Sequence, residues 1–174
     1  MILPGMTRGA PRWFANFGLP LSAADLRHAQ AYLAALGYAP DTQIEPVAGW
    51  REAGQIIRDP CWDRTWWQHE EQERERLMEQ AAALVGECAL RERLSAATML
   101  TDDPLPAAAA AARSHDADEA LIRAAAGAVA LSLHQAALAG LARSGPDHLF
   151  MRKYRIVESG RWPLGVLRGV FYLF

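Results

Sequence analysis

The sequence of 174 residues predicts a mostly α-helical fold: a helical bundle around a central apolar helix at about 117–144, with a C-terminal β-hairpin at about 153–174. Several segments repeat apolar residues at helical spacing. The 117–144 segment is apolar around its whole circumference. The C-terminal segment changes to an alternating, β-rich composition. Length and a hydrophobic content of 51% predict a single domain, with an irregular N-terminal segment (1–20), a helical core (21–145) and a β-hairpin region (150–174).

The first predicted helix follows Ser22. Ser22 and Asp25 have the spacing of a capping box, and Gly37 is a typical helix stop. A short helix is expected at 50–58, because Asp59-Pro60 ends the pattern there. The segment between these two helices is compatible with a short extended piece.

The middle of the chain predicts further helices. A long helix is expected at 62–85, followed after Gly86 by another with inward leucines. An alanine-rich stretch around 107–115 is expected to be helical from propensity alone. Asp116 and Glu119 have capping-box spacing at the start of the central helix.

Leucines and other large apolar residues on every side of the 117–144 segment predict a central helix. A helix that is apolar all round is expected to be buried among its neighbours. Gly127 and Gly140 are expected to let those neighbours approach closely. The large apolar positions are Leu121, Ile122, Val129, Leu131, Leu133, Leu138 and Leu141.

The tail is interpreted as a β-hairpin. Tyr154, Ile156 and Glu158 alternate with Arg155 and Val157, Ser159-Gly160 is a turn signal, and a β-rich run extends over 166–174. Because a two-stranded ribbon is only marginally stable, the hairpin must pack on the helices or pair with another chain. A homo-oligomer formed through the hairpin is one form this pairing could take.

Composition excludes several classes of function. The net charge of -2 and the scattered arginines give no basic face for nucleic acid. No segment has a signal-peptide core, and none has the roughly 20 uninterrupted apolar residues of a membrane span, so we expect no membrane partner and a cytoplasmic protein. Cys61 and Cys88 lack metal or redox spacing, and we expect two buried or half-buried thiols.

The candidate site lies on the long helix. Winding it at about 100° per residue places Glu70 and Glu73 within the apolar stripe that contains Trp66, with His69 at its margin. A buried ionised carboxylate needs a partner, a metal or a raised pKa. We call His69, Glu70 and Glu73 the polar turn of this helix. It predicts either a ligand or catalytic site or a buried polar network.

The central helix offers His134 as the partner. If the two helices are antiparallel neighbours, His69, Glu70, Glu73 and His134 converge. We therefore assign Glu73, His134 and Glu70 as candidate catalytic residues, His69, Glu73 and His134 as candidate metal ligands, and Trp66, Trp67 and Gln135 as the lining of a ligand pocket.

Three chemistries remain open for such a set. Histidine and carboxylate are ligands for a divalent metal such as zinc, iron or manganese. A desolvated glutamate beside histidine can act as a general acid and base pair. Carboxylates and indoles can also bind a polar or cationic ligand. Neither HExxH nor the Glu-x-x-His pairs of dimetal bundles occur here.

Two further alternatives are structural. The polar turn is also compatible with a solvated helix face whose ion pairs have helical spacing, such as Glu70 with Arg74. His134 is also compatible with a core histidine whose hydrogen bonds are satisfied.

Two functions follow from these alternatives. The first is a small helical enzyme or ligand-binding protein with a His/Glu pocket for a small molecule. The second is a non-catalytic interaction module, of accessory, regulatory or immunity type, that binds a protein partner through the hairpin and an exposed Phe171, Tyr172 or Phe174. The sequence favours the first, because a central apolar helix leaves His134 few roles other than a functional one.

Overall fold

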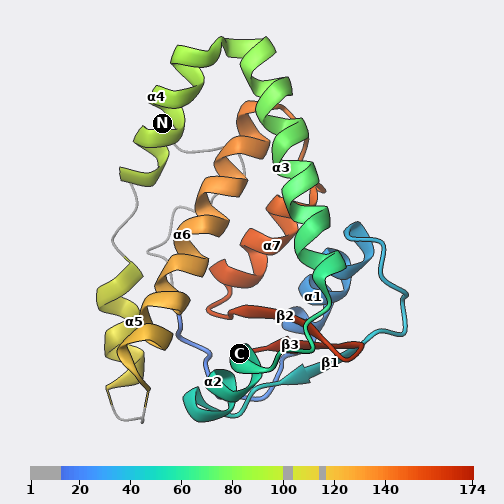
Figure 1. Cartoon of the computed structure of the whole chain (residues 1–174), viewed down its shortest axis with the longest axis vertical. Helices are drawn as coiled ribbons and strands as arrows, with labels where there is room; N and C mark the ends of the chain where they lie inside the picture. Colours follow the sequence, from blue (N-terminus) through green and yellow to red (C-terminus); the bar gives the residue numbers. More distant parts are fainter. Residues whose placement is uncertain (1–12, 100–103, 114–116) are drawn as a thin grey trace.

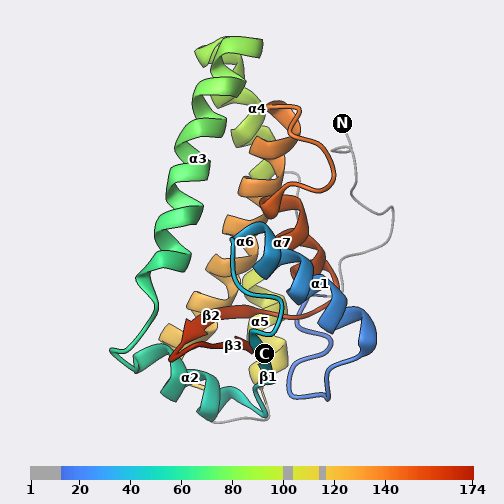
Figure 2. The same cartoon turned by 90° about the vertical axis from the view of Figure 1, so that its right-hand side faces the viewer.

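The computed structural model describes residues 13–99, 104–113 and 117–174, and it confirms a mostly α-helical fold with a C-terminal β-hairpin (Figure 1). A small sheet lies across one end of the helices, while α3 leads to the corner with α4 at the other end (Figures 1 and 2). In chain order the described elements are α1 (Ala23–Ala35), β1 (Gln43–Pro46), α2 (Trp50–Arg58), α3 (Arg64–Val85), α4 (Glu87–Met99), α5 (Pro104–Ala112), α6 (Glu119–Leu141), α7 (Leu149–Glu158), β2 (Pro163–Leu167) and β3 (Val170–Leu173).

The helix starts follow local capping chemistry. Ser22 and Asp25 form the predicted capping box of α1, with Ser22 Oγ accepting from the Asp25 N–H at 3.1 Å and the Asp25 carboxylate accepting from the Ser22 N–H at 2.9 Å. Asp118 caps α6 by accepting from the Leu121 N–H at 2.7 Å. The predicted cap Asp116 lies outside the described residues.

Helix α6 is central, as predicted, and packs against α3, α4, α5 and α7. It is not buried all round, because Leu131 is 45% exposed. Among the described residues, α6 is long and apolar enough to cross a membrane, and 56% of its most apolar 18-residue window is buried inside the protein. A core helix passes the same test of length and composition.

The predicted start of the hairpin is wrong. Residues 153–158 belong to α7, so the hairpin is confined to β2 and β3. The buried residues Phe150, Tyr154 and Val157 recur at intervals of four and three, which is helical spacing. His148 caps this helix by accepting from the Phe150 N–H at 3.2 Å. The alternation in the tail was too short to distinguish a strand from this helix.

The hairpin pairs within the chain. The sheet order is β1-β3-β2, with β1 parallel and β2 antiparallel to the central strand β3. Of the three aromatic residues expected at the surface, Phe171 and Phe174 are fully buried and Tyr172 is partly exposed. These aromatic residues therefore belong mainly to the core and do not form the exposed patch expected for an interaction module. The two cysteines, Cys61 and Cys88, are exposed rather than buried.

Candidate functional site

The polar turn of α3 divides among several neighbours, and Glu70 is its buried member. Only 3% of Glu70 is exposed. Its carboxylate accepts hydrogen bonds from the Tyr32 hydroxyl on α1 and, at 2.7 Å, from the Lys153 ammonium on α7. The Gln135 side-chain amide on α6 lies 3.4 Å away. This is a buried polar network in which a cation and hydrogen-bond donors compensate the carboxylate.

Trp66 extends the same network toward the surface. Its indole N–H donates to the Tyr32 hydroxyl at 2.8 Å, and the Lys153 ammonium lies 5.7 Å from the centre of a Trp66 ring. Burial and the Glu70 carboxylate raise the pKa of Tyr32 well above its usual value. Tyr32 therefore stays protonated and donates to Glu70, which fixes the direction of the hydrogen bonds.

Glu73 faces the start of α7 instead. Its carboxylate lies 2.7 Å from Nε2 of His148 and also pairs with Arg76. Hydrogen bonds from Arg76 and then His148 outweigh the effect of burial and lower the pKa of Glu73 to about 2. Because His148 Nδ1 accepts from the backbone, its Nε2 carries the hydrogen that is donated to Glu73. This contact fastens the middle of α3 to α7.

His69 turns toward α1. Its Nδ1 lies 2.8 Å from the Leu36 carbonyl oxygen, so Nδ1 carries the hydrogen and donates it. The solvated pair expected between Glu70 and Arg74 is wrong, because Glu70 is buried and Arg74 pairs with Glu71 at 2.8 Å. The polar turn is therefore a solvated face on one side and a buried network on the other.

The structure does not bring His69, Glu70, Glu73 and His134 together. Helices α3 and α6 run in the same direction rather than antiparallel (Figure 1). Neighbouring residues on a helix point about 100° apart, so Gln135 turns toward Glu70 while His134 faces elsewhere. Within the described ranges, no group of three or more His, Cys, Asp or Glu side chains could hold a metal ion. The zinc, iron or manganese set is not assembled from these residues.

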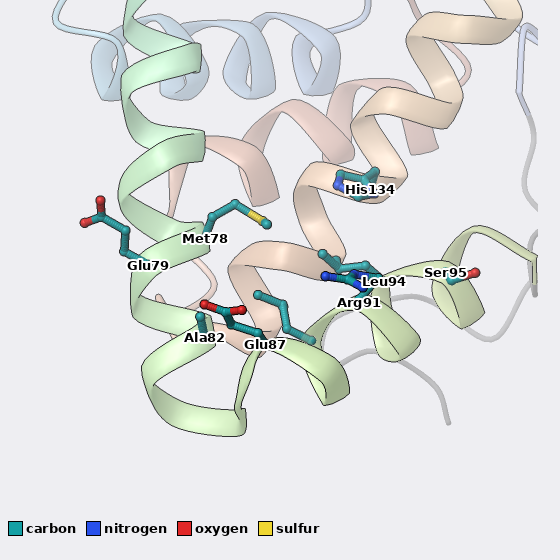
Figure 3. A pocket seen from close by; sticks show the side chains of 9 residues that line it. Met78, Glu79, Ala82, Glu87, Arg91, Leu94, Ser95 and His134 are labelled. Atoms are coloured by element: carbon teal, nitrogen blue, oxygen red, sulfur yellow. The ribbon is translucent and has the colours of Figure 1, made fainter.

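His134 instead lines a pocket between α3, α4 and α6, which we call the His134 pocket (Figure 3). Its volume is about 610 Å³. Burial lowers the pKa of His134 below its usual 6.5, and the positive charge of Arg74 lowers it further. The lining residues are Met78, Glu79, Ala82, Glu87, Leu90, Arg91, Leu94, Ser95 and His134.

The three residues predicted to line a ligand pocket, Trp66, Trp67 and Gln135, do not line one common pocket. Trp66 and Trp67 line a different groove, near the start of α3, and Gln135 is 99% buried in the Glu70 network. Lys153 was missed by sequence reasoning, although it is the only lysine in the chain. The helical spacing of Phe150, Lys153 and Val157 would have placed it on the buried face of α7.

Arg161 is a second buried cation that the sequence did not reveal. Its guanidinium lies 3.2 Å from the Asp25 carboxylate and donates to the carbonyl oxygens of Leu19 and Pro20 at 2.9 and 2.7 Å. Burial raises the pKa of Asp25, but hydrogen bonds from Ser22 and the contact with Arg161 outweigh it and lower the pKa. This cluster fastens the start of α1 to the segment before β2.

Comparison of the chain with protein-family models, with curated proteins and with solved structures gave no match.

Proposed function

We propose that the protein binds a small, largely apolar molecule in the His134 pocket. The observation that carries the proposal is an apolar pocket between three helices with an imidazole of lowered pKa in its wall. Ligand sites in proteins have volumes of about 300–1,000 Å³ and combine apolar walls with a few polar groups. Met78, Ala82 and Leu94 supply the apolar walls here.

The charges around the pocket favour an uncharged ligand. Glu87 and Arg91 lie one turn apart on α4 and have opposite charges, so their fields partly cancel. Glu79 points away from α6 (Figure 3). With its pKa below 6.5, His134 is neutral near pH 7.

A neutral imidazole both donates and accepts hydrogen bonds. The ligand that fits these properties has an apolar body and one uncharged hydrogen-bonding group. Such a group would pair with the ring of His134 while the body fills the space between the helices.

Small-molecule binding is favoured over protein binding through the hairpin. The interaction hypothesis requires exposed aromatic residues in the tail, whereas Phe171 and Phe174 are fully buried. The central strand β3 is also paired on both sides, by β1 and β2. The His134 pocket, by contrast, is open to a ligand without rearrangement of the sheet.

The test uses N-phenyl-1-naphthylamine, an uncharged fluorescent molecule with one N–H group. Its fluorescence is measured during titration with the wild type and with two variants in which an alanine of α3 is replaced by phenylalanine. Ala82 lines the pocket, and the next residue, Ala83, is exposed. Ala82→Phe fills the pocket and should weaken binding by roughly tenfold or more, while Ala83→Phe should bind as the wild type does.

Circular dichroism of both variants verifies that α3 remains helical. Absence of saturable binding to the wild type, or equal binding by the two variants, would contradict the proposal.

A further inference from the structure

Four of the six tryptophans of the chain line one groove that is separate from the His134 pocket. They are Trp62, Trp66, Trp67 and Trp162, and we call this the tryptophan groove. Its volume is about 510 Å³, and it lies where the start of α3 meets α2, α6 and β2. The groove and the His134 pocket have no lining residue in common.

The backbone of β2 supports two of the indoles. A Cβ atom on Gly165 would lie 2.8 Å from Cζ3 of Trp66 and 3.1 Å from Cζ3 of Trp62. Gly165 also has φ of +121°, a conformation that other residues rarely adopt. Glycine at this position therefore lets both rings lie directly on the strand, which fixes the wall of the groove.

Three polar groups of the lining, on Trp62, Trp66 and Asp63, are already engaged within the protein. The indole N–H of Trp62 donates to the Ile57 carbonyl oxygen at 3.3 Å, and that of Trp66 donates to Tyr32 at 2.8 Å. The Asp63 carboxylate accepts from the Tyr38 hydroxyl at 2.7 Å and from the Thr65 N–H at 2.8 Å. The two indoles thus offer ring surface rather than hydrogen bonds. A sugar, whose hydroxyl groups need directed partners, is disfavoured.

The charges near the groove disfavour a cation as well. The Lys153 ammonium already lies over a ring of Trp66 and makes the cation–π contact that a cationic ligand would otherwise make with that ring. Arg64 adds another positive charge to the lining. The lining carboxylate, Asp63, caps the start of α3 and is committed to its own hydrogen bonds.

Trp67 is the exposed tryptophan of the groove, with 58% of its surface accessible. A large indole left in water gains free energy when another apolar surface covers it. Aromatic rings that pack face to edge or in offset stacks gain an additional contribution. We propose that the tryptophan groove is a second binding site, whose ligand is a flat, uncharged aromatic ring.

The test follows the indole N–H signals of the full-length protein by NMR during titration with 2-naphthol. Signals of Trp62, Trp66, Trp67 and Trp162 should shift with one saturation curve, while those of Trp13 and Trp50 should not. Methyl β-glucopyranoside and tetramethylammonium replace 2-naphthol in parallel titrations and should give no saturable shift.

Two variants locate the site. Trp67→Ala removes an exposed wall and should weaken 2-naphthol binding by about three- to tenfold. Ala124 is an exposed alanine of α6 that lines the groove, and Ala130 is an exposed alanine further along the same helix. Ala124→Phe should block binding, whereas Ala130→Phe should leave it unchanged.

The proposal is overturned by any of three results. These are no saturable shift with 2-naphthol, binding that is unaffected by both Trp67→Ala and Ala124→Phe, or a preference for the glucoside or the tetramethylammonium ion. Ala82→Phe in the His134 pocket should leave these shifts intact, so the two sites are tested independently.

Discussion

The Lys153 ammonium lies 2.7 Å from the Glu70 carboxylate, although these side chains are only 7% and 3% exposed. The pair joins α7 to α3, and the Tyr32 hydroxyl ties it to α1. A buried charge that loses its partner is strongly destabilising, while a buried pair as a whole contributes little net free energy. Glu70 therefore has a structural role, because it connects α3 to α7 and α1.

Removing either member of this pair should destabilise the protein more than removing both. Glu70→Gln and Lys153→Met should each lower the free energy of unfolding by about 3–5 kcal/mol, because each leaves an uncompensated buried charge. The double variant should cost less than either single variant, because it leaves no buried charge unpaired. Urea denaturation measures all three.

The exposed pair Arg123 and Glu119 is the control for this cycle, with side chains 68% and 77% exposed. Its disruption by Arg123→Met should change stability by about 1 kcal/mol or less. Additive costs for Glu70→Gln and Lys153→Met would show that the two charges do not compensate each other.

Glu73 should make stability depend on pH in the acid range. Its folded-state pKa of about 2 lies below the usual 4.5, because of Arg76 and His148. The unfolded chain therefore binds the proton more readily, and the stabilisation is complete above about pH 4.5 and is lost as the pH falls toward about 2. The difference in unfolding free energy between wild type and Glu73→Gln should shrink over this range.

Urea denaturation near neutral pH and at about pH 2 measures this difference. Glu75→Gln provides a matched control, since Glu75 is an exposed carboxylate on the same helix. A difference for Glu73→Gln that stays constant with pH would refute the assignment.

Gly165→Ala should destabilise the protein more than Gly169→Ala. Both positions have positive φ, so both variants are strained. At Gly169 an added Cβ meets nothing within 4 Å, whereas at Gly165 it collides with Trp66. The additional cost of overpacking should be about 1–3 kcal/mol in the unfolding free energy. Equal costs would mean that the indoles move aside freely.

Gly127→Ala should stabilise the protein. Gly127 was expected to allow close helix packing, but it is exposed and an added Cβ meets nothing within 4 Å. Alanine in a helix interior is more favourable than glycine by about 0.5–1 kcal/mol. An increase in thermal midpoint is the expected observation, and a decrease would indicate a packing role for this glycine.

The parts of the fold that could be predicted from the sequence have local causes. The capping box of α1, the span of α2 and the central position of α6 all follow from patterns within one segment. The pairing of β1 with β3 joins residues 43–46 to 170–173, and no local pattern carries that information. The start of α7 was missed because a short alternating run resembles a strand.

The site was only partly predictable for a similar reason. The stripe of α3 correctly placed Glu70 on a buried face. Its partners Tyr32 and Lys153 come from α1 and α7, whose positions around α3 are set by tertiary packing. His134 and Gln135 were expected to face the same site. Neighbouring residues on a helix point about 100° apart, so these two face different neighbours.

The most direct test of the proposed function follows Met78 and His134 by NMR while N-phenyl-1-naphthylamine is added. Both residues line the His134 pocket, whereas His69 contacts Leu36 at the end of α1. The proposal predicts that the Met78 methyl and His134 ring signals shift with one saturation curve, while the His69 ring signals stay fixed. Saturable binding that moves neither Met78 nor His134 would contradict it.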